Sequence, residues 1–315
     1  MLIYRFPGQE IIQKTGCFQL LDTEIKEGFI VSNFDGSEKY IFSENENDSE
    51  IKIIDKEIQS VSKADYLFQG TKLVAAIRHL GIQKTVLSRV LTQEFDISKT
   101  LDLFHLLEQN YPKAFVYCFS DENLGTWLGA SPEILLQQFG NSGFTIALAS
   151  TKKPEDNSDW NEKEILEQAF VSEFIGEQLQ SIGIQNIEKE GPYDHFAGPV
   201  KHLRTDFSFS LDGISVNDVI ATLHPTPAVS GLPQNLSLDL IQSLEKHNRE
   251  LYAGFIGLAS SDKASFFVNL RCCQITKGKI NLYVGGGYTK DSNPEMEWQE
   301  TENKSRTILN LVEKL

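Results

Sequence analysis

The feature that most constrains the fold is a series of apolar, strand-like runs joined by very short turns. Three such runs, 254–260, 265–275 and 279–284, are separated by turns at 262–263 and 277–278. A turn this short reverses the chain, so the two strands it joins pair in an antiparallel manner. Helical patterns come in blocks between these runs and do not alternate with them. The sequence therefore predicts a largely antiparallel α+β fold and not a parallel doubly wound sheet.

Other elements are predicted from the spacing of apolar residues. The expected helices are 63–80, ended by Gly81, and 101–110, 159–181, 216–223 and 237–246. The other expected strands are 11–20, 28–31, 40–42, 84–91, 114–119, 126–130, 144–149 and 200–211. A polar loop at 44–50 is expected to be solvated. Because no repeat or long linker interrupts the 315 residues, we expect one domain, with residues 1–60 preceding a motif-bearing part at 61–315.

Composition narrows the class of protein. The net charge of −15 argues against nucleic-acid binding, which needs a basic stripe. No apolar run is long enough to span a bilayer and no signal peptide is recognisable, so no membrane partner is expected. The four cysteines form no Cys-x-x-Cys pair, which is typical of reduced thiols in a cytoplasmic protein. An anionic substrate would need local cations or a metal ion in so acidic a chain.

The C-terminal segment combines an apolar strand, three glycines at 285–287 and a helix that begins at Pro294. The glycines predict a bare turn whose amide groups could hold an anion. On the helix, Glu297, Glu300 and Lys304 share one face because they lie three and four residues apart. By itself this pattern also fits a solvated helix face.

A second pair of carboxylates, Glu164 and Glu167, has the same spacing on the predicted helix 159–181. Two helices that each present such a pair could supply up to four oxygen ligands. Oxygen ligands without His or Cys suit Mg²⁺. Spacing alone leaves both interpretations open, a magnesium site or two solvated faces. A metal-dependent phosphohydrolase is one alternative, although such sites normally also use Asp or His.

Four other side chains are candidates for acid–base work or anion binding. Glu133 follows a proline and precedes an apolar run, and burial there would raise its pKa and make it a proton donor. Lys84 opens a β-branched strand, where desolvation would make its amine lose a proton more readily. Tyr252 and Arg271 could hold a carboxylate, since an unpaired guanidinium in an apolar strand is costly. No second potential metal ligand lies near His202 at a typical ligand spacing, so a structural role is the default interpretation of this histidine.

Taken together, these segments resemble the chorismate-utilising enzymes, a family that contains isochorismate and salicylate synthases and the large subunits of anthranilate and aminodeoxychorismate synthases. The segments follow the family order: KTVLSR (84–89), GASPE (129–133), LAST (148–151), KEILE (163–167), KHL (201–203), LHPTPAV (223–229), ELYAG (250–254), GGG (285–287) and EWQETENK (297–304). The first eighty residues match poorly and look shortened relative to larger relatives.

The resemblance implies one α+β domain, like anthranilate synthase component I, with two large antiparallel sheets flanked by helices and a Mg²⁺-dependent site between the sheets. By position it implies that Glu167 and Glu300 are metal ligands, supported by Glu164 and Glu297. It implies that Lys84 is the base that activates water and that Glu133 is the general acid. The implied substrate contacts are Thr151, His202, Tyr252, Arg271, Gly285, Gly287 and Lys304.

Two positions imply water and not ammonia as the nucleophile. Members that use ammonia usually carry glutamine where this chain has Lys84, and the aminodeoxychorismate branch usually carries lysine at Ala149. Three positions depart from the family pattern. Ser150 replaces a glycine beside the ring carboxylate, Gln168 replaces a histidine, and Tyr288 replaces an aliphatic residue.

The expected reaction is therefore the Mg²⁺-dependent conversion of chorismate to isochorismate, an isomerase reaction that would feed menaquinone synthesis. The alternatives are a salicylate synthase, an ammonia-using large subunit and a catalytically dead binding module. We expect chorismate as the small-molecule partner, no glutaminase subunit, and a monomer or weak homodimer.

Overall fold

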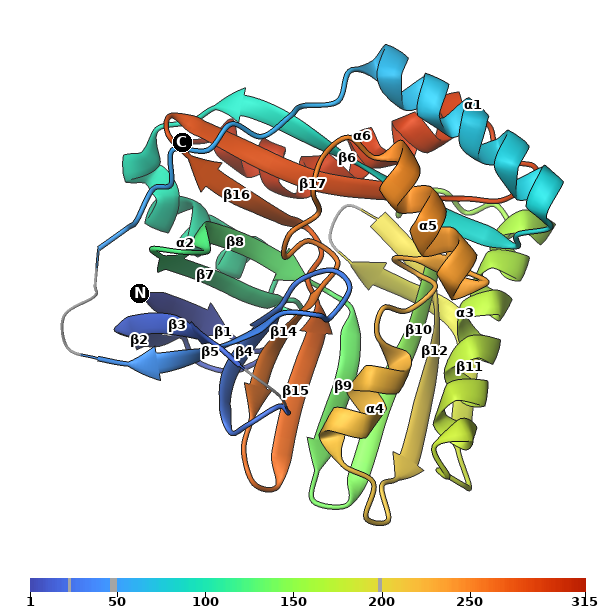
Figure 1. Cartoon of the computed structure of the whole chain (residues 1–315), viewed down its shortest axis with the longest axis horizontal. Coiled ribbons are helices and arrows are strands. Elements are labelled where there is room, and N and C mark those ends of the chain that lie inside the picture. The colour runs from blue at the N-terminus through green and yellow to red at the C-terminus, as the bar shows by residue number, and fades with distance from the viewer. Residues whose placement is uncertain (22–23, 46–49, 198–199) are drawn as a thin grey trace.

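Two antiparallel sheets form the framework of the molecule, and their strands run across one another (Figure 1). The computed structural model describes residues 1–21, 24–45, 50–197 and 200–315. In this described chain the first sheet has the strand order β13 (Gly231–Leu232), β6 (Lys84–Glu94), β17 (Lys279–Tyr288), β16 (Cys272–Thr276), β8 (Gly125–Ser131), β7 (Phe115–Asp121), β1 (Leu2–Arg5) and β2 (Ile12–Lys14). The second sheet has the order β11 (Glu188–Ala197), β12 (Val200–Ser210), β10 (Ser142–Lys152), β9 (Ile134–Phe139), β15 (Lys263–Val268), β14 (Phe255–Ala259), β4 (Gly28–Ser32), β5 (Lys39–Glu44) and β3 (Gly16–Leu20).

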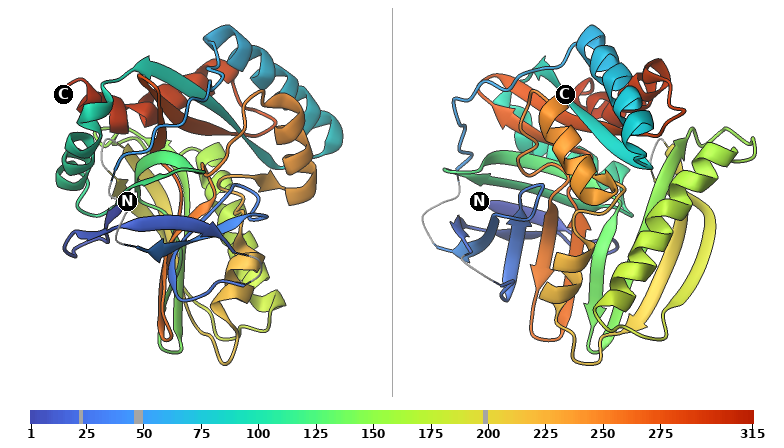
Figure 2. Two further views of the ribbon diagram at one scale, coloured as in Figure 1. Left: turned by 60° about the vertical axis from the view of Figure 1, so that its left-hand side comes forward. Right: turned by 45° about the vertical axis from the view of Figure 1, so that its right-hand side comes forward.

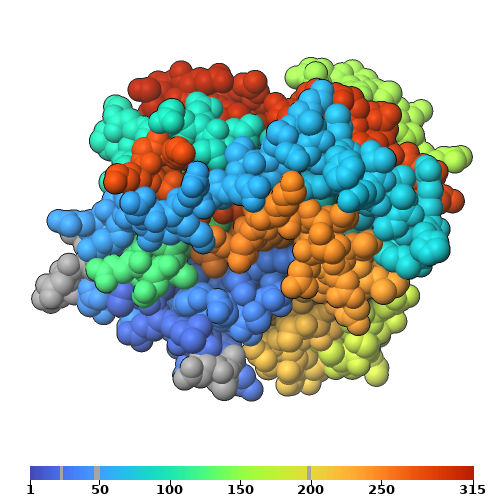
Figure 3. All heavy atoms as spheres, turned by 45° about the horizontal axis from the view of Figure 1, so that its top comes forward, coloured from blue at the N-terminus to red at the C-terminus, as the bar shows by residue number. Residues whose placement is uncertain are grey.

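Helices cover the outer faces of these sheets (Figure 2). The helices are α1 (Lys63–Leu80), the 3₁₀ turn η1 (Ile97–Lys99), α2 (Thr100–Asn110), α3 (Glu162–Ser181), α4 (Val216–Leu223), α5 (Gln234–Leu244) and α6 (Pro294–Val312). Helices α2 and α6 bury one face of the first sheet, with Phe104 and Ile308 in the shared core. Helix α3 packs on β10 and β12 of the second sheet. Helices α1 and α5 lie side by side next to β6 (Figure 3).

The largest core cluster joins the two sheets and also includes side chains of α3 and α4. Aromatic side chains from β7 meet those of the second sheet there, and the rings of Phe115 and Phe267 stack with centroids 4.9 Å apart. The prediction of one α+β domain with two antiparallel sheets is confirmed, since all paired strands of the described chain are antiparallel. Strands from the first sixty residues belong to both sheets.

The predicted single strand at 265–275 is wrong, because the chain changes sheets within it. Strand β15 ends at Val268 in the second sheet, and β16 begins at Cys272 in the first. Arg271 lies in the connection with φ of 49°, a left-handed conformation that breaks a strand. Cys272 and Cys273 then point to opposite faces, as alternation along a strand requires. Arg271 is therefore held at the crossing between the sheets and not within a strand.

The predicted bare turn at 285–287 is also wrong, because these glycines continue β17. Gly285, Gly286 and Gly287 pair with Ser88, Leu87 and Val86 of β6. A Cβ atom at Gly287 would lie 2.4 Å from Glu167 Oε1, and one at Gly285 would lie 2.9 Å from the Tyr252 hydroxyl. The glycines therefore leave room for side chains from other elements to reach the strand.

Cap residues explain why several helix predictions are correct. Ser62 accepts a hydrogen bond from the Asp65 amide at the start of α1, and Gly81 ends it with φ of 66°. The strands β1, β9, β11 and β13 have no counterpart among the predictions, and the loop predicted at 44–50 lies partly outside the described residues. All four cysteines are free thiols. In the part of the chain that the structure describes, no helix is long and apolar enough to cross a membrane.

Candidate active site

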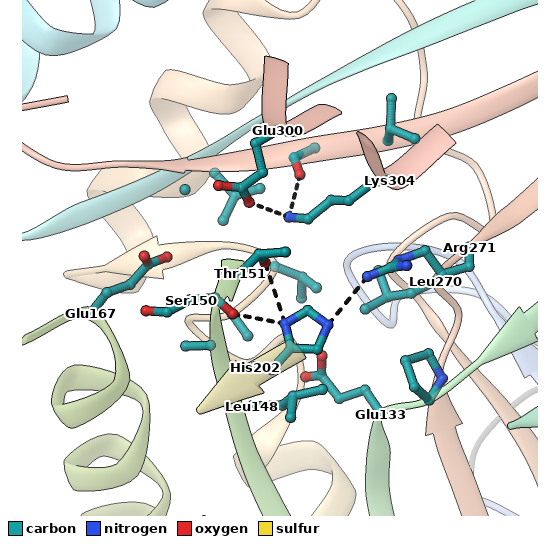
Figure 4. A pocket seen from close by; sticks show the side chains of 18 of the residues that line it. Glu133, Leu148, Ser150, Thr151, Glu167, His202, Leu270, Arg271, Glu300 and Lys304 are labelled. Carbon is teal, nitrogen blue, oxygen red and sulfur yellow. Dashed lines mark hydrogen bonds and ion pairs between the residues drawn. The ribbon is translucent and has the colours of Figure 1, made fainter. Parts of the chain in front are cut away.

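A cavity of about 710 Å³ up to its open mouth lies where β6 and β17 of the first sheet approach β10 and β12 of the second. It is lined by eleven of the thirteen predicted site residues: Lys84, Glu133, Thr151, Glu167, His202, Tyr252, Arg271, Gly285, Gly287, Glu300 and Lys304. The other two, Glu164 and Glu297, line an adjoining hollow that shares Glu167 and Glu300 with the cavity. Figure 4 shows Glu300 and Lys304 on one side and His202 and Glu133 on the other.

Lys84 is the first residue of β6, and its side chain is only 2% exposed. Its Nζ atom lies 2.8 Å from Glu167 Oε1, which projects from α3. Burial alone would raise the pKa of Glu167, but Lys84, which acts through its charge and its hydrogen bond, together with Lys163 and Lys304 holds that pKa below its usual value. Gly287 makes the pair possible, since any side chain there would collide with the Glu167 carboxylate.

Glu133 is buried between Pro132 and the apolar start of β9. Burial raises the pKa of its carboxyl to about 7, although Lys84, Lys304 and Arg271 all act to lower it. A carboxyl with this pKa is partly protonated at neutral pH and can donate a proton to a bound molecule. The three cations that affect Glu133 also line the cavity, so the acid and the amine of Lys84 face the same space.

Arg271 and His202 form a buried network. His202 Nδ1 donates to the Ser150 carbonyl oxygen over 2.7 Å, so Nε2 is left to accept from Arg271 Nη2 over 3.4 Å. Burial, reinforced by Arg271, lowers the pKa of His202 to about 3, and the ring is therefore neutral. Arg271 Nη1 donates to Thr307 Oγ1 over 3.0 Å. Within the described chain no carboxylate forms an ion pair with this guanidinium, so it is available to a bound anion.

Tyr252 is positioned by an ion pair that is not among the features predicted from the sequence. Arg249 donates to both carboxylate oxygens of Glu245, with Nη2–Oε1 at 2.6 Å, and it also donates to the backbone carbonyls of Val86 and Val229. The Tyr252 amide donates to the Arg249 carbonyl over 2.8 Å. The turn that carries Tyr252 is thereby fixed to β6. The spacing of Glu245 and Arg249, four residues apart, was the available signal.

The glutamates next to the cavity are each paired with a lysine. Lys304 Nζ lies 2.6 Å from Glu300 and donates to the Gly285 carbonyl over 2.9 Å. Lys163 Nζ lies 2.7 Å from Glu297. Glu164 lies 3.2 Å from Lys152 and also accepts from the Asn161 amide in the capping box of α3. Glu164 therefore has a clear structural role at the start of this helix.

These carboxylates fit a magnesium ion in chemistry and in charge. Burial would lower the pKa of Lys163, but Glu297, Glu167 and Glu300 together raise it. All three carboxylates therefore lie near the same ammonium group. Burial, and then Glu300, raises the pKa of Glu297 to about 7. Among the described residues no three His, Cys, Asp or Glu side chains form a ready-made metal cage, so the four-ligand arrangement is not preformed. Mg²⁺ needs only one or two protein carboxylates and takes its other ligands from water and substrate.

The three departures from the family pattern are accommodated in different ways. Ser150 has φ of 58°, a conformation that favours glycine, and its hydroxyl donates to the Glu164 carbonyl over 2.6 Å. Gln168 is buried and donates to Thr205 over 2.7 Å. Tyr288 is buried beside α1, and its ring centroid lies 6.2 Å from that of Tyr66. Ser150 thus ties β10 to α3 at the edge of the cavity.

The fold and the cavity define a two-sheet α+β protein with a buried acid, a buried amine and an unneutralised guanidinium around one small-molecule site. The model of one family, described as chorismate binding enzyme, matches residues 20–313. The chain therefore belongs to the chorismate-binding enzyme family.

Named relatives agree with this membership. The chain is 30% identical over 244 residues to the isochorismate synthase EntC of Escherichia coli strain K12, a match that covers 73% of this chain and 62% of EntC. It is 35% identical over 211 residues to the isochorismate synthase MenF of the same strain, covering 63% of this chain and 48% of MenF. The match thus spans about half to three fifths of the length of these relatives. The structure of MenF, the menaquinone-specific isochorismate synthase from Escherichia coli, superposes with a TM-score of 0.81 and 21% identity over 99% of this chain and 88% of that one.

Proposed function

We propose that this protein is an isochorismate synthase, which converts chorismate to isochorismate with Mg²⁺. The observation that carries the proposal is that Lys84 and Glu133, an amine and a carboxyl with a pKa of about 7, line the same cavity. Acid–base pairs of this kind suit a reaction that removes one proton and delivers another. Membership of the chorismate-binding family and identity to two isochorismate synthases support the substrate.

Cations around the cavity would hold the substrate dianion. The guanidinium of Arg271, which has no carboxylate partner in the described chain, would bind the enolpyruvyl carboxylate with the Tyr252 hydroxyl and backbone amides near Gly285 and Gly287. Thr151, Lys304 and neutral His202 would contact the ring side of the substrate. A chain with a net charge of −15 thereby gains a local site for an anion.

The reaction needs one proton removed and one supplied. Lys84, as the neutral amine, would accept a proton from a water molecule whose oxygen forms a bond to C2 of the ring. The ring double bonds shift, and the C4–oxygen bond breaks. Glu133 would give its proton to the departing C4 hydroxyl, which leaves as water. One water enters and one leaves, so the product is an isomer of the substrate.

Glu167 and Glu300 would hold the magnesium ion, with Glu297 and Glu164 behind them. When bound, the ion would supply a Lewis acid for the ring carboxylate. The proposed base and a proposed metal ligand are in direct contact, since Lys84 Nζ lies 2.8 Å from Glu167 Oε1. A cation held by Glu167 would compete with Lys84 for this carboxylate.

The test is to incubate the purified chain with chorismate and Mg²⁺ and to separate the products by chromatography. We expect isochorismate, no anthranilate when ammonium is added, and no turnover with EDTA. Salicylate fluorescence with release of pyruvate would instead make the protein a salicylate synthase. If chorismate stays unchanged in the presence of Mg²⁺, the proposal is contradicted. The remaining interpretation would then be a catalytically inactive binding module. We further propose, on the identity to MenF, that the product supplies menaquinone synthesis.

A further inference from the structure

A second hollow, of about 670 Å³ up to its open mouth, shares Arg271 and Pro132 with the catalytic cavity. It is formed by the turn between α2 and β7, by β8 and β11, and by Thr307 of α6. Arg271 belongs to both spaces, since its Nη2 donates to His202 in the cavity and its Nη1 to Thr307 beside the hollow. A ligand in the hollow would therefore meet the same guanidinium as the proposed substrate.

The lining of this hollow is basic in an acidic protein. Among the described residues, its lining includes Lys113, His195 and Arg271 but no Asp or Glu, although the chain has 44 acidic and 29 basic residues. Lys113 is exposed and, within the described chain, has no ion-pair partner. Burial, then Arg204 and Lys113, lowers the pKa of His195, so this ring is neutral at pH 7 and can hydrogen-bond. These charges favour an anion.

Most of the other lining residues are apolar. Tyr111, Pro112, Pro132 and Phe196 line the hollow, and Phe196 is 53% exposed despite being a large apolar side chain. Tyr111 is fixed by its hydroxyl, which donates to the Thr307 carbonyl over 3.0 Å. Aromatic and proline surfaces of this kind favour a flat ring. A simple inorganic anion would leave them unused.

We propose that this hollow is a second binding site, distinct from the catalytic cavity, for an aromatic monocarboxylate. The carboxylate is held by Lys113 and Arg271, and the ring packs against Tyr111 and Phe196. Because Arg271 serves both sites, an occupied hollow weakens substrate binding. That consequence for turnover rests on the proposed function, whereas the binding itself does not.

The experiment is calorimetric titration of the full chain with benzoate, without chorismate or metal. We expect saturable binding of benzoate and none of benzyl alcohol, which has the ring without the charge, or of acetate, which has the charge without the ring. Lys113→Glu should weaken benzoate binding at least about tenfold, the equivalent of about 1.4 kcal/mol. Phe196→Ala should weaken it severalfold. Both side chains are exposed, so the variants should fold, and thermal melting checks this.

Two control variants decide where benzoate binds. Lys277→Glu makes the same charge change in the exposed turn between β16 and β17. Thr151→Ala alters a residue that lines the catalytic cavity and its adjoining hollow but not the proposed second site. Neither should change the benzoate affinity. The proposal is overturned if benzoate does not bind, if Lys277→Glu has the effect of Lys113→Glu, or if Thr151→Ala weakens binding while Lys113→Glu does not. Since no turnover is measured, these outcomes are independent of whether the protein makes isochorismate.

Discussion

Lys84 and Glu167 form a buried ion pair that joins the proposed base to a proposed metal ligand. Their side chains are 2% and 14% exposed, and Lys84 Nζ lies 2.8 Å from Glu167 Oε1. The pKa of Glu167 is held below its usual value, so its carboxylate is charged at neutral pH and can bind a cation. A cation at the proposed metal site would therefore compete with Lys84 for this carboxylate.

Lys84→Gln should abolish water addition, because the amide cannot accept the proton. Proton transfer by a positioned group contributes about 100-fold to 10,000-fold in rate, so we expect kcat for isochorismate formation to fall by at least about 100-fold. Lys63→Gln, which removes an exposed lysine paired with Glu295, is the control and should leave kcat unchanged. Turnover retained in Lys84→Gln would remove Lys84 from the proposed role.

Glu133 should make folding stability depend on pH. The usual pKa of its carboxyl is 4.5, and burial raises it to about 7 in the folded protein. Between these values the folded state keeps a proton that the unfolded state has released. The free energy of unfolding therefore contains a contribution from Glu133 that is fully present below pH 4.5. This contribution, roughly 3 kcal/mol, is lost as the pH rises through 7. In urea unfolding at pH 5 and pH 8, Glu133→Gln should therefore gain stability relative to wild type at pH 8. An unchanged difference between the two proteins would contradict the raised pKa.

At the scale of elements, β17 carries the glycines that let α3 and the 249–252 turn reach the first sheet. Their φ angles are not in the left-handed region, so the need for glycine here is space and not backbone freedom. Other elements thus approach β17 closely, and its antiparallel pairing with β6 holds it beside the cavity.

Gly287→Ala should impair the site and spare the fold. The added methyl would lie 2.4 Å from Glu167 Oε1 and 3.0 Å from Lys84 Cε, so the ion pair must move, whereas alanine is compatible with the strand. We expect a large loss of kcat/KM with a nearly unchanged melting temperature. Gly176→Ala is the matched control, because a Cβ atom there meets nothing within 4 Å. Equal activity in the two variants would contradict the packing argument.

The turn that carries Tyr252 depends on the buried pair of Glu245 and Arg249, each with a side chain 3% exposed. Arg249→Met would leave the carboxylate buried and uncompensated, at a cost of about 3–5 kcal/mol in the free energy of unfolding. Lys63→Met, which breaks an exposed pair, should cost less than about 1 kcal/mol. Urea unfolding measures both. Similar small costs would show that Glu245 is neutralised by another group.

At the scale of the whole molecule, a chain with a net charge of −15 brings Glu167, Glu297 and Glu300 from two helices to one hollow. Mg²⁺ should therefore raise the melting temperature. At 100 times its Kd a ligand that binds only the folded state adds about 2.7 kcal/mol. Glu300→Gln should remove most of this shift, while Glu295→Gln, which removes an exposed glutamate from the same helix, should not. No shift in wild type, or the same shift in Glu300→Gln, would argue against a magnesium site there.

Much of the secondary structure could be read from local signals. The bounds of α1 and α4 agree with the sequence prediction, because cap residues and apolar spacing act over a few residues. Strand β11 escaped prediction because its sequence, EKEGPYDHFA, is polar and broken by glycine and proline. The break at Arg271 escaped because the run on both sides is apolar, and the left-handed residue that separates the strands is not a glycine.

The sequence by itself determined the antiparallel architecture, the family and the identity of the residues proposed to act, because short turns, caps and motif segments are local properties of the chain. Only the tertiary structure decided that Lys84 pairs with Glu167, that Arg271 lies at the crossing of two sheets between two hollows, and that the glycines of β17 make room instead of turning the chain. Each of these depends on the packing of segments far apart in sequence, and such packing is settled by the fold as a whole and not by any local pattern.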